Sequence, residues 1–107
     1  MNTTSLRVAP PLLTLLATLT ALPAAATDTP DPRARTLAAT CANCHGTTGQ
    51  AQGALASLAG RPAAQTLRSL DEFRDGRRPA TIMHQIVKGY RADELQLIAD
   101  HFARQEP

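Results

Sequence analysis

Two thiols and an imidazole stand close together in a chain that has no other cysteine. Cys41, Cys44 and His45 form the pattern C-x-x-C-H within 107 residues. Near the end of a helix, thiols three positions apart can each add to one of the two vinyl groups along a haem edge, and the adjacent imidazole can then bind the iron. The motif therefore predicts one covalently attached haem c, with thioethers at Cys41 and Cys44 and with His45 as an axial iron ligand.

Other chemistry is open to the same residues. A disulfide between Cys41 and Cys44 would close only a small loop and stabilise little. A thioredoxin-like redox pair requires a βαβ setting, for which the sequence has no pattern. A structural zinc site needs about four ligands, and the further candidates, His84 and His101, do not stand at finger-like spacing. A chance match is the last alternative, and the features described below favour haem over all four.

An electron carrier needs a ligand on each side of its iron, because an open face invites dioxygen or peroxide chemistry. After residue 26 the chain has one methionine, Met83, about forty residues beyond the motif. A thioether ligand raises the reduction potential relative to a second imidazole. We therefore predict Met83 as the second axial ligand, against the alternative of ordinary core packing. His84 and His101 are the rival ligands, and His101 is expected to face solvent.

The first 26 residues have the features of a secretory signal peptide. Arg7 is the only charged residue before Asp28, an apolar run extends to Leu22, and small residues stand at Ala24 and Ala26. The run is too short, and too rich in Thr, for a membrane span of about 20 apolar residues. We expect export to the periplasm with cleavage after about Ala26, and no stable membrane insertion.

The composition after the signal segment restricts the class of protein. Residues 27–107 carry ten basic and nine acidic residues, a net charge of +1, and no Lys/Arg run longer than Arg77-Arg78. This balance argues against a nucleic-acid partner. The same segment has three aromatic residues and no tryptophan, so side chains alone supply little volume for a core. A large flat cofactor would fill the interior.

The arrangement of polar and apolar residues predicts a small all-α domain over residues 33–107, wrapped around the haem and without significant sheet. A flexible leader is expected over residues 27–32. Asp31 is a favourable N-cap and Pro32 a favourable first residue for a helix over about 32–43. That helix would present the motif near its C-terminal end.

Three further helices are expected from apolar residues at helical spacing, over about 61–74, 81–88 and 92–105. Gly76 is a plausible stop for the first of these, whereas the last lacks the usual Ser or Thr cap near Arg91. The apolar side chains expected to surround the haem are Leu37, Leu58, Leu67, Leu70, Ile82, Ile86, Leu95, Ile98 and Phe102.

Essentially all of residues 27–107 resembles the class I cytochromes c. Residues 58–60 (L-A-G) and 70–77 (L-D-E-F-R-D-G-R) are similar to periplasmic two-haem cytochromes and their one-haem relatives. Residues 81–90 (T-I-M-H-Q-I-V-K-G-Y) resemble the methionine-ligand segment of the cytochrome subunit of flavocytochrome c sulfide dehydrogenase. The resemblance implies that Met83 is the axial methionine.

The resemblance also implies a function. A periplasmic carrier with a single haem would transfer one electron at a time and accept electrons from a flavoprotein, such as the flavin subunit of a sulfide dehydrogenase. A free shuttle to a terminal oxidase or to another cytochrome is the alternative, and a haem enzyme or gas sensor with an open sixth position is a third. The first two make the protein an electron carrier and not an enzyme, and fold alone does not separate them.

Two features depart from the pattern of many such relatives. A proline whose carbonyl accepts the Nδ1–H of the histidine ligand is replaced by Ala56, whose carbonyl can still accept this bond. The chain also lacks tryptophan, a frequent donor to a haem propionate. The candidates to replace it are Arg61, Arg68, Arg77, Arg78 and Tyr90.

Overall fold

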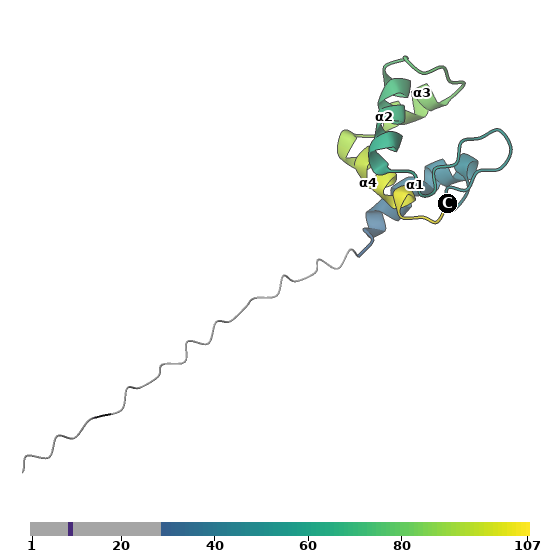
Figure 1. Cartoon of the computed structure of the whole chain (residues 1–107). Helices are drawn as coiled ribbons and strands as arrows, with labels where there is room; N and C mark the ends of the chain where they lie inside the picture. Colours follow the sequence, from purple (N-terminus) through teal and green to yellow (C-terminus); the bar gives the residue numbers. More distant parts are fainter. Residues whose placement is uncertain (1–8, 10–28) are drawn as a thin grey trace, which may run out of the picture.

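The computed structural model describes Ala9 and residues 29–107, and the latter segment forms four α-helices and one 3-10 turn (Figure 1). No strand occurs among these residues, in agreement with the predicted all-α fold. The expected signal peptide over residues 1–26 lies outside the described residues, Ala9 excepted, and so does the beginning of the expected leader. No helix in the described part of the chain is long and apolar enough to cross a membrane.

Helix α1 (Pro32–His45) carries the two cysteines and the adjacent histidine in its last turns. It begins as the sequence predicts, because Asp31 Oδ1 accepts a hydrogen bond from the backbone N–H of Arg33 at 2.8 Å. It extends two residues beyond the predicted end and stops at Gly46, whose φ of 87° suits glycine and few other residues. The chain therefore changes direction directly after His45.

The other predicted helices form with small changes at their ends. Helix α2 (Ala63–Arg74) begins after Pro62, which has extended backbone angles. The short predicted helix divides into α3 (Met83–Ile86) and the 3-10 turn η1 (Val87–Gly89). Helix α4 (Ala92–Ala103) completes the domain, and it packs against both α1 and α2.

The core lies where α4 packs against α1, and most of its buried residues belong to the C-terminal half of the sequence (Figure 1). The apolar stripe predicted on α4 is buried in full, at Leu95, Ile98, Ala99 and Phe102. Burial of each large apolar side chain stabilises the fold by roughly 1.5–3 kcal/mol. The helix that bears the motif is thus fixed against the longest apolar face of the domain.

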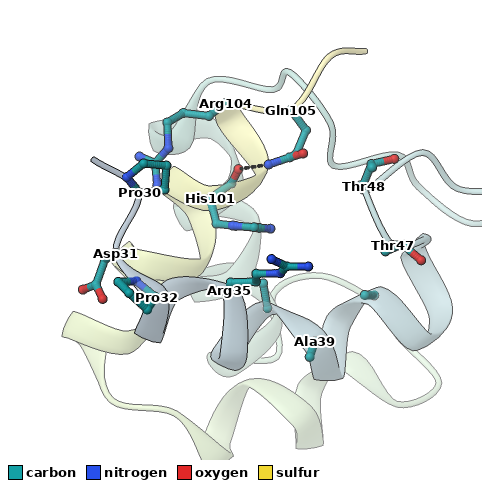
Figure 2. A pocket seen from close by; sticks show the side chains of 12 residues that line it. Pro30, Asp31, Pro32, Arg35, Ala39, Thr47, Thr48, His101, Arg104 and Gln105 are labelled. Atoms are coloured by element: carbon teal, nitrogen blue, oxygen red, sulfur yellow. Dashed lines mark hydrogen bonds between the residues drawn. The ribbon is translucent and has the colours of Figure 1, made fainter. Parts of the chain in front are cut away.

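The sequence-based expectation for His101 is wrong. We expected a solvent-facing side chain, but His101 is half-buried, and its ring meets the Phe102 ring edge-on with centroids 5.2 Å apart. Figure 2 shows the imidazole close to the guanidinium of Arg35 from α1. Burial lowers the pKa of His101, and the charges of Arg104 and Arg35 lower it further. The periodicity of α4 alone could not show that α1 covers this side of the helix.

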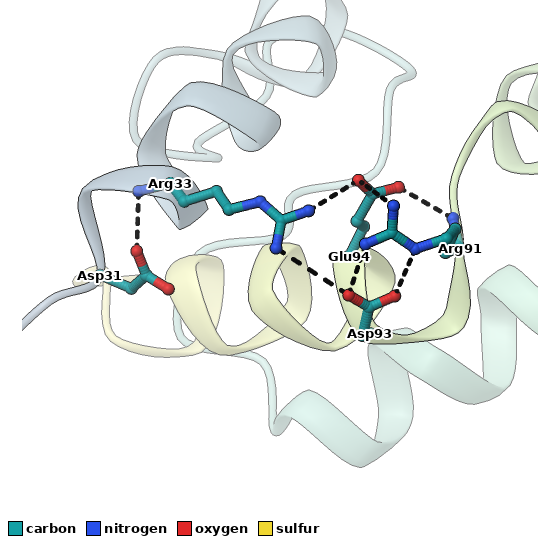
Figure 3. A network of polar contacts seen from close by, with 5 residues as sticks. All are labelled: Asp31, Arg33, Arg91, Asp93 and Glu94. Atoms are coloured by element: carbon teal, nitrogen blue, oxygen red, sulfur yellow. Dashed lines mark hydrogen bonds and ion pairs between the residues drawn. The ribbon is translucent and has the colours of Figure 1, made fainter.

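A network of charged groups joins the beginnings of α1 and α4 (Figure 3). Arg33 Nη2 lies 2.9 Å from Glu94 Oε1, and Arg91 Nη2 lies 2.8 Å from Asp93 Oδ2. The other oxygen of Glu94 accepts the backbone N–H of Arg91 at 3.0 Å, which replaces the missing Ser or Thr cap. Exposed ion pairs contribute little, about 0–1 kcal/mol each, so the network chiefly fixes the orientation of the two helices.

Candidate functional site

The four residues singled out by the sequence line one cavity of about 410 Å³. Cys41, Cys44 and His45 enter it from the end of α1, and Met83 enters it from the beginning of α3. The remaining walls come from α2, from Ile98 of α4 and from the two loops on either side of α2. Side chains about forty positions apart in the sequence thus meet at a single site.

Most of the cavity wall is apolar, but the predicted set of wall residues is only partly correct. Five of the nine predicted side chains line the cavity, namely Leu58, Leu70, Ile82, Ile86 and Ile98. The other four belong to the core behind the cavity, namely Leu37, Leu67, Leu95 and Phe102. Leu55 and Phe73 are additional wall residues that the sequence analysis missed. Helical periodicity identifies an apolar face, but it does not distinguish a core contact from a cavity wall.

The loop after α1 returns to support His45. The Nδ1 atom of His45 lies 2.6 Å from the carbonyl oxygen of Ala56, as expected for an imidazole that donates Nδ1–H and keeps Nε2 available for a metal. The Gly49 carbonyl accepts the N–H groups of Leu58 and Ala59 at 2.7 and 3.2 Å, which closes the loop. The expected backbone support for the imidazole is therefore present although Ala56 replaces a proline.

The segment that follows Met83 is tied to α2 by a contact that the sequence did not reveal. Arg74, the last residue of α2, donates from Nη2 to the carbonyl of Tyr90 at 3.0 Å and to that of Val87 at 3.4 Å. These bonds tie η1, and with it the preceding α3, to the end of α2. The rival residues lie elsewhere, because neither His84 nor His101 is among the residues that line the cavity.

The thiols have properties that argue against the competing chemistries. Burial raises the pKa of the Cys41 thiol, and the neighbouring Cys44 raises it further. A dithiol redox pair requires the opposite shift. The two sulfurs form no disulfide, and the described residues contain no group of three or more His, Cys, Asp or Glu side chains placed to hold a metal ion. The position of both sulfurs at an apolar cavity is compatible with their addition to the vinyl groups of a haem.

One buried polar atom also indicates that the cavity takes a ligand. Thr66 is 3% exposed, lines the cavity, and its Oγ1 has no hydrogen-bond partner among the described residues. Buried hydroxyl groups in folded proteins are nearly always hydrogen-bonded. Two thiols, an imidazole, a thioether, apolar walls and an unpartnered hydroxyl together fit a haem held by both covalent and coordinate bonds.

Comparison with protein families agrees with this geometry. The model of the family described as cytochrome c matches residues 33–99. The chain belongs to the cytochrome c family. Cytochromes c are electron carriers, and the C-x-x-C-H pattern at residues 41–45 fits the haem c that the family binds.

Two curated cytochromes are similar in sequence to this chain. The cytochrome subunit of sulfide dehydrogenase from Chlorobaculum tepidum (strain ATCC 49652 / DSM 12025 / NBRC 103806 / TLS) is 35% identical over 72 residues, which are 67% of this chain and 66% of that protein. Cytochrome c-552 from Acidithiobacillus ferridurans is 32% identical over 63 residues, 59% of this chain and 27% of that protein. The chain thus spans less than two thirds of the length of either relative.

Proposed function

We propose that this cytochrome is exported to the periplasm, carries a single haem c attached at Cys41 and Cys44, and transfers one electron at a time with His45 and Met83 as axial ligands. The observation that carries the proposal is that these four side chains line one cavity with largely apolar walls. When bound, haem supplies an iron that alternates between the ferrous and ferric states. The residues around it decide how readily it does so.

The choice of Met83 as second ligand is supported by the placement of its rivals. Met83 lines the cavity, whereas His84, next to it in sequence, does not, and His101 lines a groove elsewhere on the molecule. A thioether favours the ferrous state, and apolar walls disfavour the additional positive charge of ferric iron. Both effects raise the reduction potential, as suits an acceptor of electrons.

The structure narrows the residues available for the haem propionates. Arg61 and Arg78 line the cavity, whereas Arg68, Arg77 and Tyr90 do not. Arg78 is oriented by Glu72, with Nε and Oε2 2.8 Å apart, and its guanidinium lies 5.5 Å from the centroid of the Phe73 ring. We assign the propionate contacts to Arg61 and Arg78, because a guanidinium binds carboxylates through two parallel hydrogen bonds.

A redox partner is proposed to dock at the rim of the cavity. Leu55 and Ile82 line it and are 51% and 56% exposed, and they are the large apolar side chains most exposed in the described part of the chain. An apolar rim excludes water from a small, transient contact, as electron-transfer encounters require. The similarity to a cytochrome subunit of sulfide dehydrogenase supports a flavoprotein as this partner. Copurification with a flavoprotein would separate this role from that of a free shuttle.

The mass of the secreted protein tests the proposed haem attachment and signal cleavage together. We expect material from a host that matures c-type cytochromes to have the mass of residues 27–107 plus one haem, and to stain for haem on a denaturing gel. Covalent attachment is the reason that the stain survives unfolding. A protein that has the mass of its polypeptide alone would contradict the function proposed here.

Arg74→Gln is expected to loosen the methionine ligand without changing the cavity wall. The variant loses charge-assisted bonds to the carbonyls of Val87 and Tyr90, and such a bond contributes about 1.5–3 kcal/mol. The absorption band of the iron–methionine bond, near the red end of the ferric spectrum, should then disappear at a lower temperature than in the unchanged protein. Arg68→Gln is the matched control, because Arg68 is exposed on the same helix. Equal midpoints for the two variants would show that Arg74 does not position Met83.

A further inference from the structure

A second concave surface lies along α1, on a different side of the helix from the haem cavity. This groove has a volume of about 930 Å³ and is bordered by α1, by the end of α4 and by the loop after α1 (Figure 2). Arg35, Ala39 and Ala42 line it, whereas Thr40, Cys41 and Cys44 line the haem cavity. Positions 35, 39 and 42 point away from positions 40, 41 and 44 at 100° per residue. A molecule in the groove would leave the haem cavity accessible.

Three basic side chains face this groove from two helices. Arg35 belongs to α1, His101 belongs to α4, and Arg104 is the C-cap residue of α4. Figure 2 shows Arg35 and His101 side by side, with Arg104 near Pro30 at one end. Burial lowers the pKa of His101, and the charges of Arg104 and Arg35 lower it further, as expected for an imidazole near two guanidinium groups.

The two arginines differ from four other arginines of the described segment. Arg33, Arg77, Arg78 and Arg91 each form an ion pair with an acidic side chain, but within residues 29–107 neither Arg35 nor Arg104 does so. One acidic residue, Asp31, also lines the groove. Asp31 accepts the N–H of Arg33 as the cap of α1, and Asp100 accepts a bond from Gln96. The groove therefore carries two guanidinium groups against one carboxylate, an excess of one positive charge.

We propose that this groove binds a carboxylate-rich segment of a partner protein, with Arg35 and Arg104 holding its acidic side chains. Charge complementarity is the basis for this occupant, since an arginine binds a carboxylate through two parallel hydrogen bonds. The exposed hydroxyls of Thr47 and Thr48 at the other end of the groove add neutral donors. The inference does not depend on the identity of the haem ligands.

The shape of the groove favours a protein segment over a small inorganic anion. Small oxyanions bind where several backbone N–H groups converge, at a helix N-terminus or in a nest. Here the N-terminus of α1 is already capped by Asp31, and five of the lining residues are alanine or proline. A groove that combines apolar side chains with two arginines from different ends of the chain instead suits a peptide segment with acidic side chains. A partner held here could remain bound while electrons pass at the cavity rim.

The test is a titration of the reduced holoprotein with a peptide of ten glutamates, followed by heteronuclear NMR. We expect the amide signals of Thr47 and Thr48 and the imidazole signals of His101 to shift as the peptide binds. The double variant Arg35→Gln/Arg104→Gln should bind about fivefold more weakly, as expected for the loss of two exposed ion pairs. The control Arg68→Gln/Arg77→Gln removes the same charge away from the groove and should keep its affinity.

Four results would overturn the proposal. One is the absence of peptide binding, and the second is an equal loss of affinity in the two double variants, which would indicate general attraction between opposite charges. The third is displacement of the peptide by inorganic phosphate at an equal concentration of negative charge, at constant ionic strength, which would indicate a small-anion site. The fourth is that the NMR signals that shift belong only to residues at the rim of the haem cavity, which would show that the peptide binds outside the groove.

Discussion

Met83→Ala is expected to give a cytochrome that retains its covalent haem but binds carbon monoxide and loses the iron–methionine absorption band. Alanine has no atom that can coordinate iron, so one side of the metal becomes accessible to external ligands. The reduction potential should fall by an appreciable part of the roughly 0.8 V range that axial ligands span, because the thioether no longer favours the ferrous state. Ferric absorption spectra, carbon monoxide titration and a redox titration measure the three effects.

His84→Ala is the matched control for this experiment. His84 adjoins Met83 in sequence and in α3, but it does not line the cavity. The control should therefore retain the absorption band and the potential of the unchanged protein. If the potential stays the same in Met83→Ala and falls in His84→Ala, the ligand assignment is wrong by one residue.

The features that the sequence predicts well are those with a local cause. Asp31 and Pro32 start α1 through a single hydrogen bond and a fixed backbone angle. The stripe on α4 is buried at Leu95, Ile98, Ala99 and Phe102, because α1 and α2 both pack against this helix. The contact between His45 and Ala56 follows from the motif and a short loop. In each case the interacting residues are close in sequence or repeat at the helical period.

The features that the sequence did not predict arise between distant segments. His101 is half-buried because α1 and the loop after it pack beside the end of α4, and no pattern within α4 records that. Arg74 donates hydrogen bonds to backbone carbonyl groups. Every residue has such a group, so the sequence does not identify the residues that Arg74 contacts. The basic groove combines Arg35 and Arg104, which are far apart in sequence and have no shared spacing. Such sites become visible only when the helices are packed.

Loss of the cysteines has the second large expected effect. Cys41→Ser and Cys44→Ser should each leave one thioether, and the double variant should lose all haem stain on a denaturing gel, because coordination by His45 and Met83 does not survive unfolding. The two single variants differ in their effect on the fold. Cys41 is half-buried against the core, so serine places a hydroxyl in a largely apolar position, whereas Cys44 is exposed.

Because of this difference, the effect of each cysteine on haem attachment can be measured separately from its effect on the stability of the fold. Cys44→Ser should weaken the stain with little change in thermal stability, and Cys41→Ser should weaken the stain and also lower the unfolding temperature. Comparing the stain per molecule with the unfolding temperature of the folded fraction shows which effect dominates in each variant. Undiminished stain in the double variant would mean that the haem is bound to the chain by other atoms. Equal stability of the single variants would mean instead that the Cys41 sulfur contributes to attachment and not to packing.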